Sequence, residues 1–489
     1  MRVRIVAVLL LGMPGAAEPI RLHPKNPHYF LFRGRPVALV TSGEHYGAVL
    51  NGDFDYRKYL DALQADGMNY TRIFTGSYVE RPGAFGILRN NLAPAAGRLA
   101  APWARSDAAG YANGGNKFDL DRWSAAYFDR LRSFATEADR GGIVVEVTLF
   151  SSHYGNDNWA LSPLHPSNNV NGTTAIDRRK LHTLDNGNIL GRQEQMVRKI
   201  VRELNEFDNV FFEIQNEPWA DLTVTVDTVN PYLQEPALLN FPNSVDLASE
   251  ESLAWQERVA GWIVDEESRL PGRHLIAQNY CNFRYPVRAR EIAPGVSIVN
   301  FHYAYPEAAT LNYGLGKLLG YDESGFLGTS DAAYRTQGWN FLLAGGGLYN
   351  SLDYSFTVGR EDGTDTLPNG PGGGSPALRQ QLKVLSDFLH SFRLLELRPD
   401  PDVVRRSPGC YARALSAAGA EYAVYVTGRG RCEFDLDLPA GRYRGEWVNT
   451  TSGAIDRREE FTHPGGERRF AAPAFEEDAA LALRRFAVQ

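Results

Sequence analysis

Two glutamates in this sequence stand where predicted β-strands end. Glu217 follows the apolar run at 210–215, and Glu323 ends the run at 318–323. Two carboxyl groups that face each other across a cleft can divide acid–base work between them. The protonated one assists a departing oxygen, and the ionised one attacks or stabilises the anomeric carbon of a sugar. If the fold brings the two strand ends together, the pair therefore indicates hydrolysis of a glycosidic bond.

Polar and aromatic residues that suit the same chemistry follow other predicted strands. Arg72 lies near the end of the run at 69–74, where a cation could hold Glu323 in its ionised form. Trp159 and Trp219 offer flat apolar faces suited to the C–H face of a sugar ring. Any one such residue is commonly a hydrogen-bonded wall residue, so the prediction depends on how many of them stand at strand ends. The other candidates for substrate contact are His45, Tyr46, His153, Tyr154, His302, Tyr303 and Tyr305.

An alternation of β-rich runs and amphipathic helical stretches, from about residue 37 onward, would position these side chains. Eight runs, each followed by a helix or a long loop, predict an α/β fold, a (β/α)8 TIM barrel, whose chemistry lies at the C-terminal ends of the strands. An open sheet of seven or nine strands is the alternative, because the fifth and seventh runs are weakly marked. The predicted strands are 36–42, 69–74, 143–150, 210–215, 274–279, 296–302, 318–323 and 347–354, and the predicted helices are 119–140, 191–207, 249–270 and 375–395.

The sequence pattern changes after the Pro- and Asp-rich segment 398–402. Six short β-rich runs between residues 411 and 486 alternate with Gly- and Pro-rich turns and show no helical pattern. They predict a small C-terminal antiparallel β-sandwich. We therefore predict a barrel over 18–398 and a β-sandwich accessory domain over 399–489.

The first 17 residues have the features of a secretory signal peptide. A short basic start precedes an apolar run at 5–13, and small residues follow at Gly15 and Ala17. The run is shorter than the roughly 20 residues that a membrane span needs, and no later segment approaches that length. We expect the segment 1–17 to be removed and the mature protein to be soluble and secreted or periplasmic. A buried first strand is the alternative interpretation.

The chain has three cysteines, Cys281, Cys410 and Cys432, which is too few for a disulfide scaffold. Export would permit a bond between Cys410 and Cys432. However, these two fall on the first and third of three consecutive β-rich runs, and alternate strands of a simple meander lie about 10 Å apart. We therefore expect buried free thiols.

Composition and motifs exclude several other classes. The 489 residues include 51 basic and 58 acidic side chains, and a formal net charge of −7 does not favour nucleic acid as a partner. The sequence contains no HExxH, P-loop, GxSxG or zinc-ligand spacing, so we predict neither a cofactor nor a metal. An oligomeric state does not follow from the composition.

The triplet Asn216-Glu217-Pro218, with Glu323 after the seventh strand, resembles the retaining glycoside hydrolases of clan A, the 4/7 superfamily, and within it the cellulase-like family 5. The resemblance spans roughly residues 24–395. It implies that Glu217 is the general acid/base, that Glu323 is the nucleophile and that Asn216 binds the sugar 2-hydroxyl. The remaining implied site residues are Arg72, which would position the nucleophile, and His153, His302 and Tyr303.

Two positions depart from that family's pattern. Where the family carries His-x-Tyr after the sixth strand, His302 is followed directly by Tyr303, which leaves open whether Tyr303 or Tyr305 touches the nucleophile. The tryptophan that usually follows the eighth strand is absent, and the segment 349–354 stands in its place. The candidates for substrate contact there are Asp353 and Tyr354.

The opening segment 23–30 and the stretches 438–443 and 447–449 resemble a branch in which the cellulase-like barrel precedes a β domain of the collagen-binding type. Collagen binding does not follow from these residues. A β-sandwich packed on a barrel is more often a structural cap.

The leading hypothesis is an exported retaining β-glycosidase that acts on a polysaccharide or its oligosaccharides. Two alternatives use the same residues: a transglycosylase, or a surface glycan-binding or adhesion protein whose barrel has lost turnover. The long insertions at 78–118, 156–188 and 221–249 favour a closed pocket over a long groove, and hence exo action or short substrates. The sugar and the linkage stay open.

Overall fold

The computed structural model describes residues 18–227, 244–281, 292–303, 305–366, 370–417, 419–428 and 430–486. The predicted signal peptide at 1–17 lies outside these residues.

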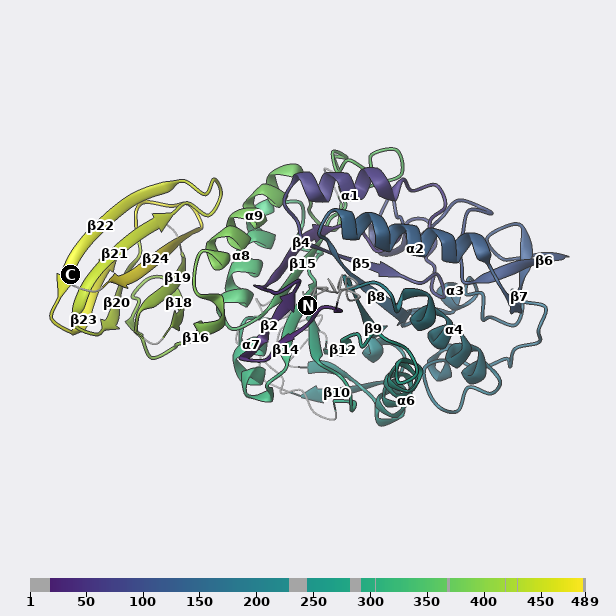
Figure 1. Cartoon of the computed structure of the whole chain (residues 1–489). Coiled ribbons are helices and arrows are strands. Elements are labelled where there is room, and N and C mark those ends of the chain that lie inside the picture. Colours follow the sequence, from purple (N-terminus) through teal and green to yellow (C-terminus); the bar gives the residue numbers. More distant parts are fainter. Residues whose placement is uncertain are drawn as a thin grey trace, which may run out of the picture.

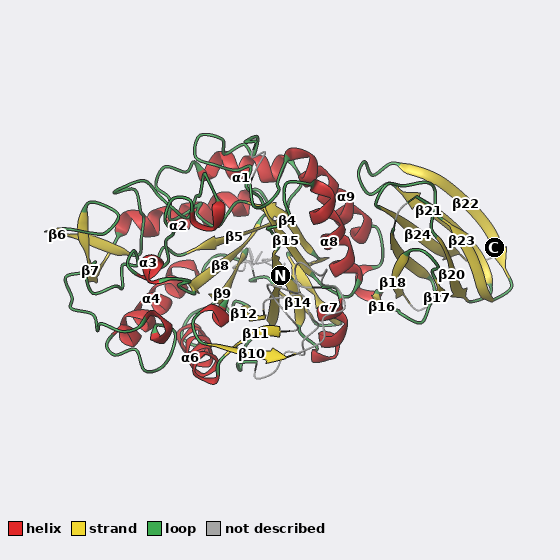
Figure 2. Ribbon diagram, turned by 180° about the vertical axis from the view of Figure 1, so that it is seen from behind, coloured by secondary structure: helices red, strands yellow, loops and turns green. Residues whose placement is uncertain are grey.

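Eight parallel strands form a nearly closed barrel surrounded by helices (Figures 1 and 2). Their order around the ring is β4-β15-β14-β13-β12-β9-β8-β5. Between the first and last of these strands, the side chain of Asn69 donates to the Ala38 carbonyl at 2.9 Å and accepts from the Val40 amide at 2.8 Å. The strands are β4 (Leu39–Gly43), β5 (Tyr70–Phe74), β8 (Val144–Ser151), β9 (Val210–Asn216), β12 (Ile276–Cys281), β13 (Ile298–His302), β14 (Leu318–Glu323) and β15 (Leu348–Leu352). All eight predicted strands are present, and the TIM-barrel prediction is confirmed.

The outer helices bury one apolar face each against the strands. Three begin at a serine N-cap that accepts a backbone N–H: Ser124 from Tyr127 in α2, Ser249 from Ser252 in α6 and Ser375 from Leu378 in α9. The main helices are α1 (Tyr56–Ala65), α2 (Ala125–Arg140), α4 (Ile189–Leu204), α6 (Glu250–Glu267), α7 (Glu307–Asn312), α8 (Asp331–Leu343) and α9 (Pro376–His390).

The helix predicted at 119–140 was placed too early. Its first residues belong to β7 (Asn116–Trp123), which pairs with β6 (Trp103–Ala109) in a hairpin that projects from the barrel. Trp123 therefore pairs with Trp103 across this hairpin instead of lying on the helical stripe.

A small N-terminal sheet covers the N-terminal end of the barrel. It consists of β1 (Arg21–His23), β2 (Asn26–Phe32) and β3 (Arg35–Val37). Phe30 of β2 is fully buried in one cluster with Leu39, Leu318 and Leu348, which lie at the starts of barrel strands. Since this end is filled by apolar side chains, the polar residues of the interior gather at the opposite, C-terminal end.

The C-terminal region forms two antiparallel sheets, as predicted. The larger has the order β16-β18-β19-β24-β21-β22 and the smaller the order β17-β20-β23. Their strands are β16 (Arg398–Pro399), β17 (Val404–Arg406), β18 (Tyr411–Ala417), β19 (Glu421–Thr427), β20 (Glu433–Leu438), β21 (Gly441–Val448), β22 (Ile455–His463), β23 (Gly466–Ala471) and β24 (Asp478–Phe486).

The prediction of free thiols at Cys410 and Cys432 is wrong, because the two form a disulfide with a Cα–Cα distance of 5.6 Å. The reason is topological. The strands β18, β19 and β20 do not make a meander, since β20 belongs to the opposite sheet. Cys410 and Cys432 directly precede β18 and β20, so the bond joins the two sheets.

The larger sheet packs against α8 and α9 of the barrel (Figure 1). Trp339 of α8 stacks on Tyr425 with ring centroids 5.2 Å apart, and Arg335 donates to Asp478 at 2.7 Å. Tyr425 belongs to the same buried cluster as the barrel helices. The division at 398/399 into two separate domains therefore stays a prediction.

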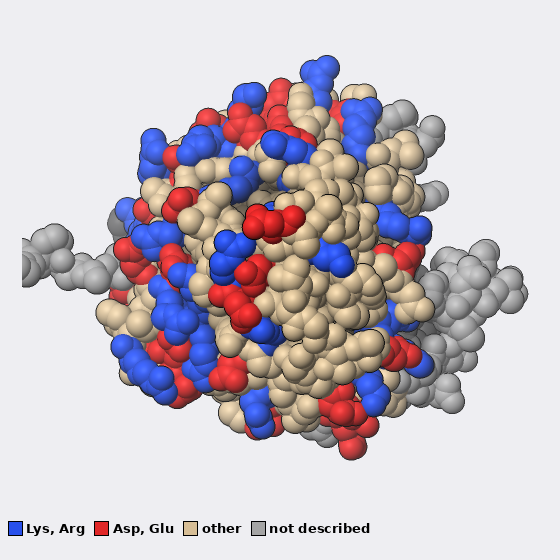
Figure 3. Space-filling model, turned by 90° about the vertical axis from the view of Figure 1, so that its right-hand side faces the viewer, with Lys and Arg blue, Asp and Glu red and all other residues tan. Residues whose placement is uncertain are grey.

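On the face shown in Figure 3, Lys and Arg side chains are interspersed with Asp and Glu side chains. Among the helices of the described ranges, none has both the length and the apolar character that crossing a membrane requires.

The disulfide predicts the thiol content of the protein. Protein purified without reductant and denatured in guanidinium chloride should react with about one equivalent of a thiol reagent, from Cys281, and with three after reduction. Replacing Cys410 and Cys432 together by serine should lower the free energy of unfolding by about 3 kcal/mol, as expected for a closed loop of this length. Three reactive thiols in the unreduced protein would contradict the pairing.

Candidate active site

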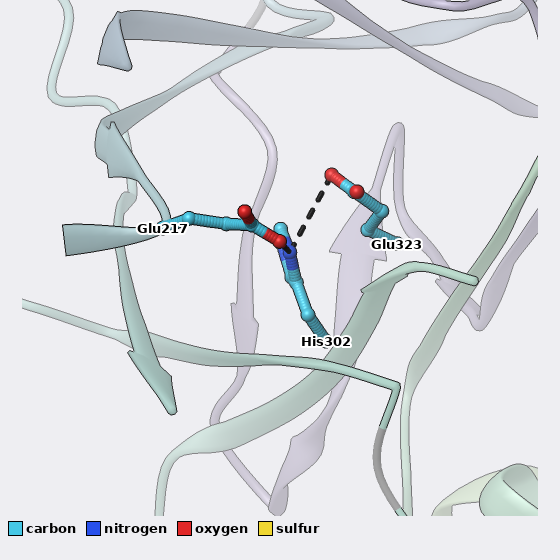
Figure 4. A group of neighbouring side chains, drawn as sticks. All are labelled: Glu217, His302 and Glu323. Carbon is cyan, nitrogen blue, oxygen red and sulfur yellow. Dashed lines mark hydrogen bonds and ion pairs between the residues drawn. The ribbon is translucent and has the colours of Figure 1, made fainter. Parts of the chain in front are cut away.

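Glu217 and Glu323 come together at the C-terminal end of the barrel, at the ends of β9 and β14. Figure 4 shows the two side chains pointing toward one another with the ring of His302 between them. His302 Nδ1 lies 2.9 Å from Glu217 Oε1 and 3.4 Å from Glu323 Oε2. One ligand atom of each of the three residues lies within 4.8 Å of the others. The predicted pair of carboxylates therefore shares one small, buried site.

The backbone around this site is locally strained. Tyr46, Glu217 and Tyr303 have φ values of 61°, 51° and 50°, in the left-handed region that residues with large side chains rarely adopt. Each follows the end of a barrel strand, so the turn aims its side chain across the mouth. Strain of this kind persists only where the surrounding structure holds it, and it gathers at functional sites.

Glu323 receives more donors than Glu217. The hydroxyl of Tyr303 donates to Glu323 Oε1 at 2.5 Å, and Tyr46 Oη and Arg72 Nη1 both donate to Oε2 at 3.4 Å. Burial raises the pKa of Glu323, while His302, Arg72 and Tyr303 oppose that rise and Glu217 adds to it. Of the two tyrosines that the sequence offered after β13, Tyr303 thus bonds the expected nucleophile.

Glu217 is bonded by a tyrosine hydroxyl and by a histidine ring nitrogen. Tyr154 donates to Glu217 Oε2 at 2.5 Å, and His302 contacts Oε1. Asn216 links the two halves of the site, because its Nδ2 donates to Tyr154 Oη at 3.0 Å and its Oδ1 accepts from Arg72 at 3.0 Å. Among the described residues, the guanidinium of Arg72 contacts Glu323 and makes no contact with Glu217.

Below the pair, Arg72 lies among three further acids inside the barrel. Its Nε donates to Glu213 at 3.0 Å, its Nη2 lies 3.3 Å from Asp322, and its plane stacks 4.6 Å over the ring of Tyr46. Glu213, Asp322 and Glu146 are fully buried. Burial raises the pKa of Glu213 to about 7 against the lowering effect of Arg72. One cation thus balances more than one buried carboxylate.

His302 connects the upper pair with these lower acids. Its Nε2 lies 3.3 Å from Asp322 Oδ1. Burial alone would lower the pKa of His302, but the charges of Glu323 and Asp322 raise it well above its ordinary value. A positively charged ring in this position neutralises part of the charge of both catalytic candidates.

Two groups of side chains have the composition of a metal site in the described part of the chain. They are Glu217 with His302 and Glu323, and Glu146 with Glu213 and Asp322. In both groups a protein cation already occupies the position between the carboxylates. His302 does so in the first, and Arg72 lies against Glu213 and Asp322 in the second. The positive charges of His302 and Arg72 therefore balance part of the negative charge of these carboxylates.

The other predicted residues divide into two sets. His45 and Tyr354 stack at 5.4 Å, and both feel the charge of Glu323. The buried hydroxyl of Tyr354 has no hydrogen-bond partner in the described residues. Trp219 contacts the edge of His302 at 5.5 Å. His45, Tyr354 and Trp219 therefore join the site.

The second set consists of His153, Trp159, Asp353 and Tyr305. His153 and Trp159 pack edge to face at 5.4 Å, and Trp159 is only 4% exposed, so neither of its faces is open. Asp353 accepts from Ser42 and Arg379, both at 2.8 Å, in a fully buried ion pair. This pairing gives Asp353 a structural role in the part of the chain described. Tyr305 is half-buried beyond β13.

Sequence reasoning missed the lower acids and the aromatic residues at the rim of the mouth. Glu146 and Glu213 each interrupt an apolar strand run, and a charge at a position that must be buried is itself a signal of a paired site. Phe85 and Phe326, described below, follow no periodic pattern and could not have been identified in this way.

No protein-family model and no curated protein sequence matches the chain. Solved structures match across most of its length. One described as a glycoside hydrolase is 14% identical, with a TM-score of 0.60 and coverage of 96% of this chain and 97% of that chain. A glycoside hydrolase family 5 protein from Bacteroides vulgatus ATCC 8482 is 12% identical, with a TM-score of 0.57 and coverage of 96% and 93%. At these identities the likeness shows the fold, a barrel followed by a β domain.

The buried charge network predicts that replacing Arg72 lowers the free energy of unfolding more than replacing an exposed arginine. Arg72→Met should lower the free energy of unfolding by about 3–5 kcal/mol near neutral pH, because buried Glu213 would lose the guanidinium that it bonds and Asp322 would keep only His302 beside it. The exposed Arg122, paired with Asp119 and 58% exposed, provides the control, and Arg122→Met should cost less than about 1 kcal/mol. Denaturant unfolding measures both. Equal losses of unfolding free energy in the two variants would show that Arg72 does not balance the buried acids.

Proposed function

We propose that this protein is a retaining glycoside hydrolase that cleaves β-glycosidic bonds. The observation that carries the proposal is the close approach of two carboxylates, whose nearest oxygens lie within 4.8 Å across the mouth of the barrel. Carboxyl groups about 5–5.5 Å apart suit double displacement, whereas an inverting enzyme needs about 6.5–9.5 Å to admit a water molecule between carboxylate and sugar. The fold shared with known glycoside hydrolases supports the same assignment.

The hydrogen-bond donors around each carboxylate indicate which one is the nucleophile and which one is the acid/base. Arg72 and the hydroxyls of Tyr303 and Tyr46 all stabilise a negative charge on Glu323, which suits a nucleophile. Glu217 has no guanidinium partner among the described residues and is bonded by Tyr154 and His302, which suits a residue that delivers a proton to the leaving oxygen. Two carboxylates this close cannot both be ionised without cost, so one proton is shared between them.

In the first step the Glu217 carboxyl gives its proton to the glycosidic oxygen. Glu323 forms a bond to the anomeric carbon as the carbon–oxygen bond breaks, and the leaving group departs as an alcohol. In the second step the Glu217 carboxylate takes a proton from water, whose oxygen attacks the anomeric carbon and releases the Glu323 carboxylate. Asn216, held between Arg72 and Tyr154, would bind the hydroxyl next to the anomeric carbon.

We also propose that the chain is exported. The pattern of residues 1–17 is that of a signal peptide, and the disulfide Cys410–Cys432 is of the kind that persists in oxidising compartments.

Chemical rescue tests the two roles separately. With an activated aryl β-glycoside, Glu217→Ala should lose deglycosylation, and azide should restore turnover at least about tenfold and yield the β-glycosyl azide, because azide replaces water without needing a base. Glu323→Gly should lose activity, and azide should there yield the α-glycosyl azide. Unchanged hydrolysis by Glu323→Gly would refute the assignment.

Loss of one hydroxyl should shift the pH profile. The hydrogen bond from Tyr303 lowers the pKa of Glu323, so Tyr303→Phe should raise that pKa. Since Glu323 must be ionised to attack, the acidic limb of kcat/KM should move to higher pH, with roughly a tenfold loss of rate. Tyr305→Phe removes a hydroxyl two residues along the chain and should leave the limb in place. A limb that moves equally in both variants, or to lower pH in Tyr303→Phe, would contradict the assigned contact.

A further inference from the structure

Two phenylalanines are exposed at the mouth of the barrel. Phe85 is 44% exposed and Phe326 is 41% exposed, whereas the other phenylalanines of the described barrel are largely buried. Phe85 lies in the insertion at 78–118, and Phe326 follows β14. Their rings contact one another with centroids 6.5 Å apart and planes at 73°. Two segments far apart in the sequence thus place one apolar pair at the surface.

Each of these rings also contacts a tyrosine that bonds a catalytic candidate. Phe85 meets the ring of Tyr154 edge to face at 5.1 Å, and Tyr154 donates to Glu217. Phe326 meets Tyr303 at 6.0 Å, and Tyr303 donates to Glu323. The exposed pair is therefore separated from the two carboxylates by one layer of tyrosines.

The backbone at both positions is in the left-handed region, with φ 54° at Phe85 and 59° at Phe326. Six non-glycine residues of the described chain have positive φ, and five of them belong to this site: Tyr46, Phe85, Glu217, Tyr303 and Phe326. A phenylalanine in this region is unfavourable, and glycine would fit better. Packing in the core does not explain why phenylalanine stands at these two positions, since both side chains are substantially exposed.

The segment that carries Phe85 is anchored on both sides of the mouth. Asn91 donates to the carbonyl of Phe356 at 2.8 Å and to Glu44 at 3.1 Å. Arg89 forms an ion pair with Asp365 in the loop that follows β15. These bonds hold the exposed ring in position without covering it, which is the arrangement that a preorganised contact surface requires.

We propose that Phe85 and Phe326 form an aromatic contact site for the sugar that leaves when the glycosidic bond is cleaved. This inference rests on the proposed function, because it takes Glu217 as the residue that protonates the leaving oxygen. Phe85 packs against Tyr154, which bonds that carboxyl, so a leaving group that extends outward past Tyr154 meets the phenyl ring. The apolar C–H face of a pyranose matches such a surface. The substrates are thus saccharides whose leaving group is itself a sugar.

The test compares two kinds of substrate with the same glycon. The probes are β-1,4-linked disaccharides of glucose, galactose, mannose and xylose, and the β-glycosyl fluoride of each sugar, whose leaving group cannot contact the rings. On the best pair, Phe85→Ala and Phe326→Ala should each lower kcat/KM for the disaccharide by about tenfold, the order expected for a lost apolar contact. The loss on the fluoride should be less than threefold. Tyr411 of β18, which is 46% exposed, supplies the control. Tyr411→Ala should leave kcat/KM unchanged for both substrates.

A second variant separates binding from folding. Phe85→Gly relieves the positive φ, so its melting temperature should not fall, yet its disaccharide kinetics should match those of Phe85→Ala. Equal losses on disaccharide and fluoride, or no loss on the disaccharide, would overturn the aromatic site and leave the proposed function standing. Failure of the wild-type protein to hydrolyse any of these probes, or any member of a panel of β-linked polysaccharides and oligosaccharides, would overturn the proposed function, and the aromatic site with it.

Discussion

Glu217 and Glu323 place acidic oxygens within 4.8 Å of one another in a part of the barrel that is almost closed to solvent. Two negative charges at that separation repel strongly where water does not screen them. The pair is therefore stable only if one carboxyl keeps a proton and donors surround the other. His302 between them and the hydroxyls of Tyr154 and Tyr303 meet that requirement. The same arrangement is what a double displacement needs before substrate arrives.

The rest of the barrel supports this pair. Arg72 compensates Glu323 from below and is itself compensated by Glu213 and Asp322. The guanidinium and both lower acids are buried. Removing one of these charges would therefore leave another without a partner in the low-dielectric interior. The N-terminal sheet fills the opposite end of the barrel with apolar side chains, so that polar groups are confined to one mouth. Stability and chemistry thus depend on one network.

Much of the fold follows from the sequence, because apolar strand runs and their alternation with helices are local signals. The helix at 331–343 was missed, since it is buried between the barrel and the larger sheet and lacks a polar stripe. The disulfide Cys410–Cys432 was missed, since local runs do not reveal which sheet a strand joins. The two catalytic candidates could be predicted because each stands at a strand end. Phe85 could not, because a surface ring on an irregular segment leaves no periodic signal.

Double displacement requires Glu323 to form a covalent bond to the sugar. Incubation with 2-deoxy-2-fluoro-β-glycosyl fluorides, which slow the release of a glycosyl-enzyme, tests this claim most directly. We expect time-dependent inactivation, a mass increase of one fluorosugar per chain, and a label on the peptide that contains Glu323. A label on another residue would contradict it, and so would unlabelled protein that releases the α-anomer of a β-glycoside it hydrolyses.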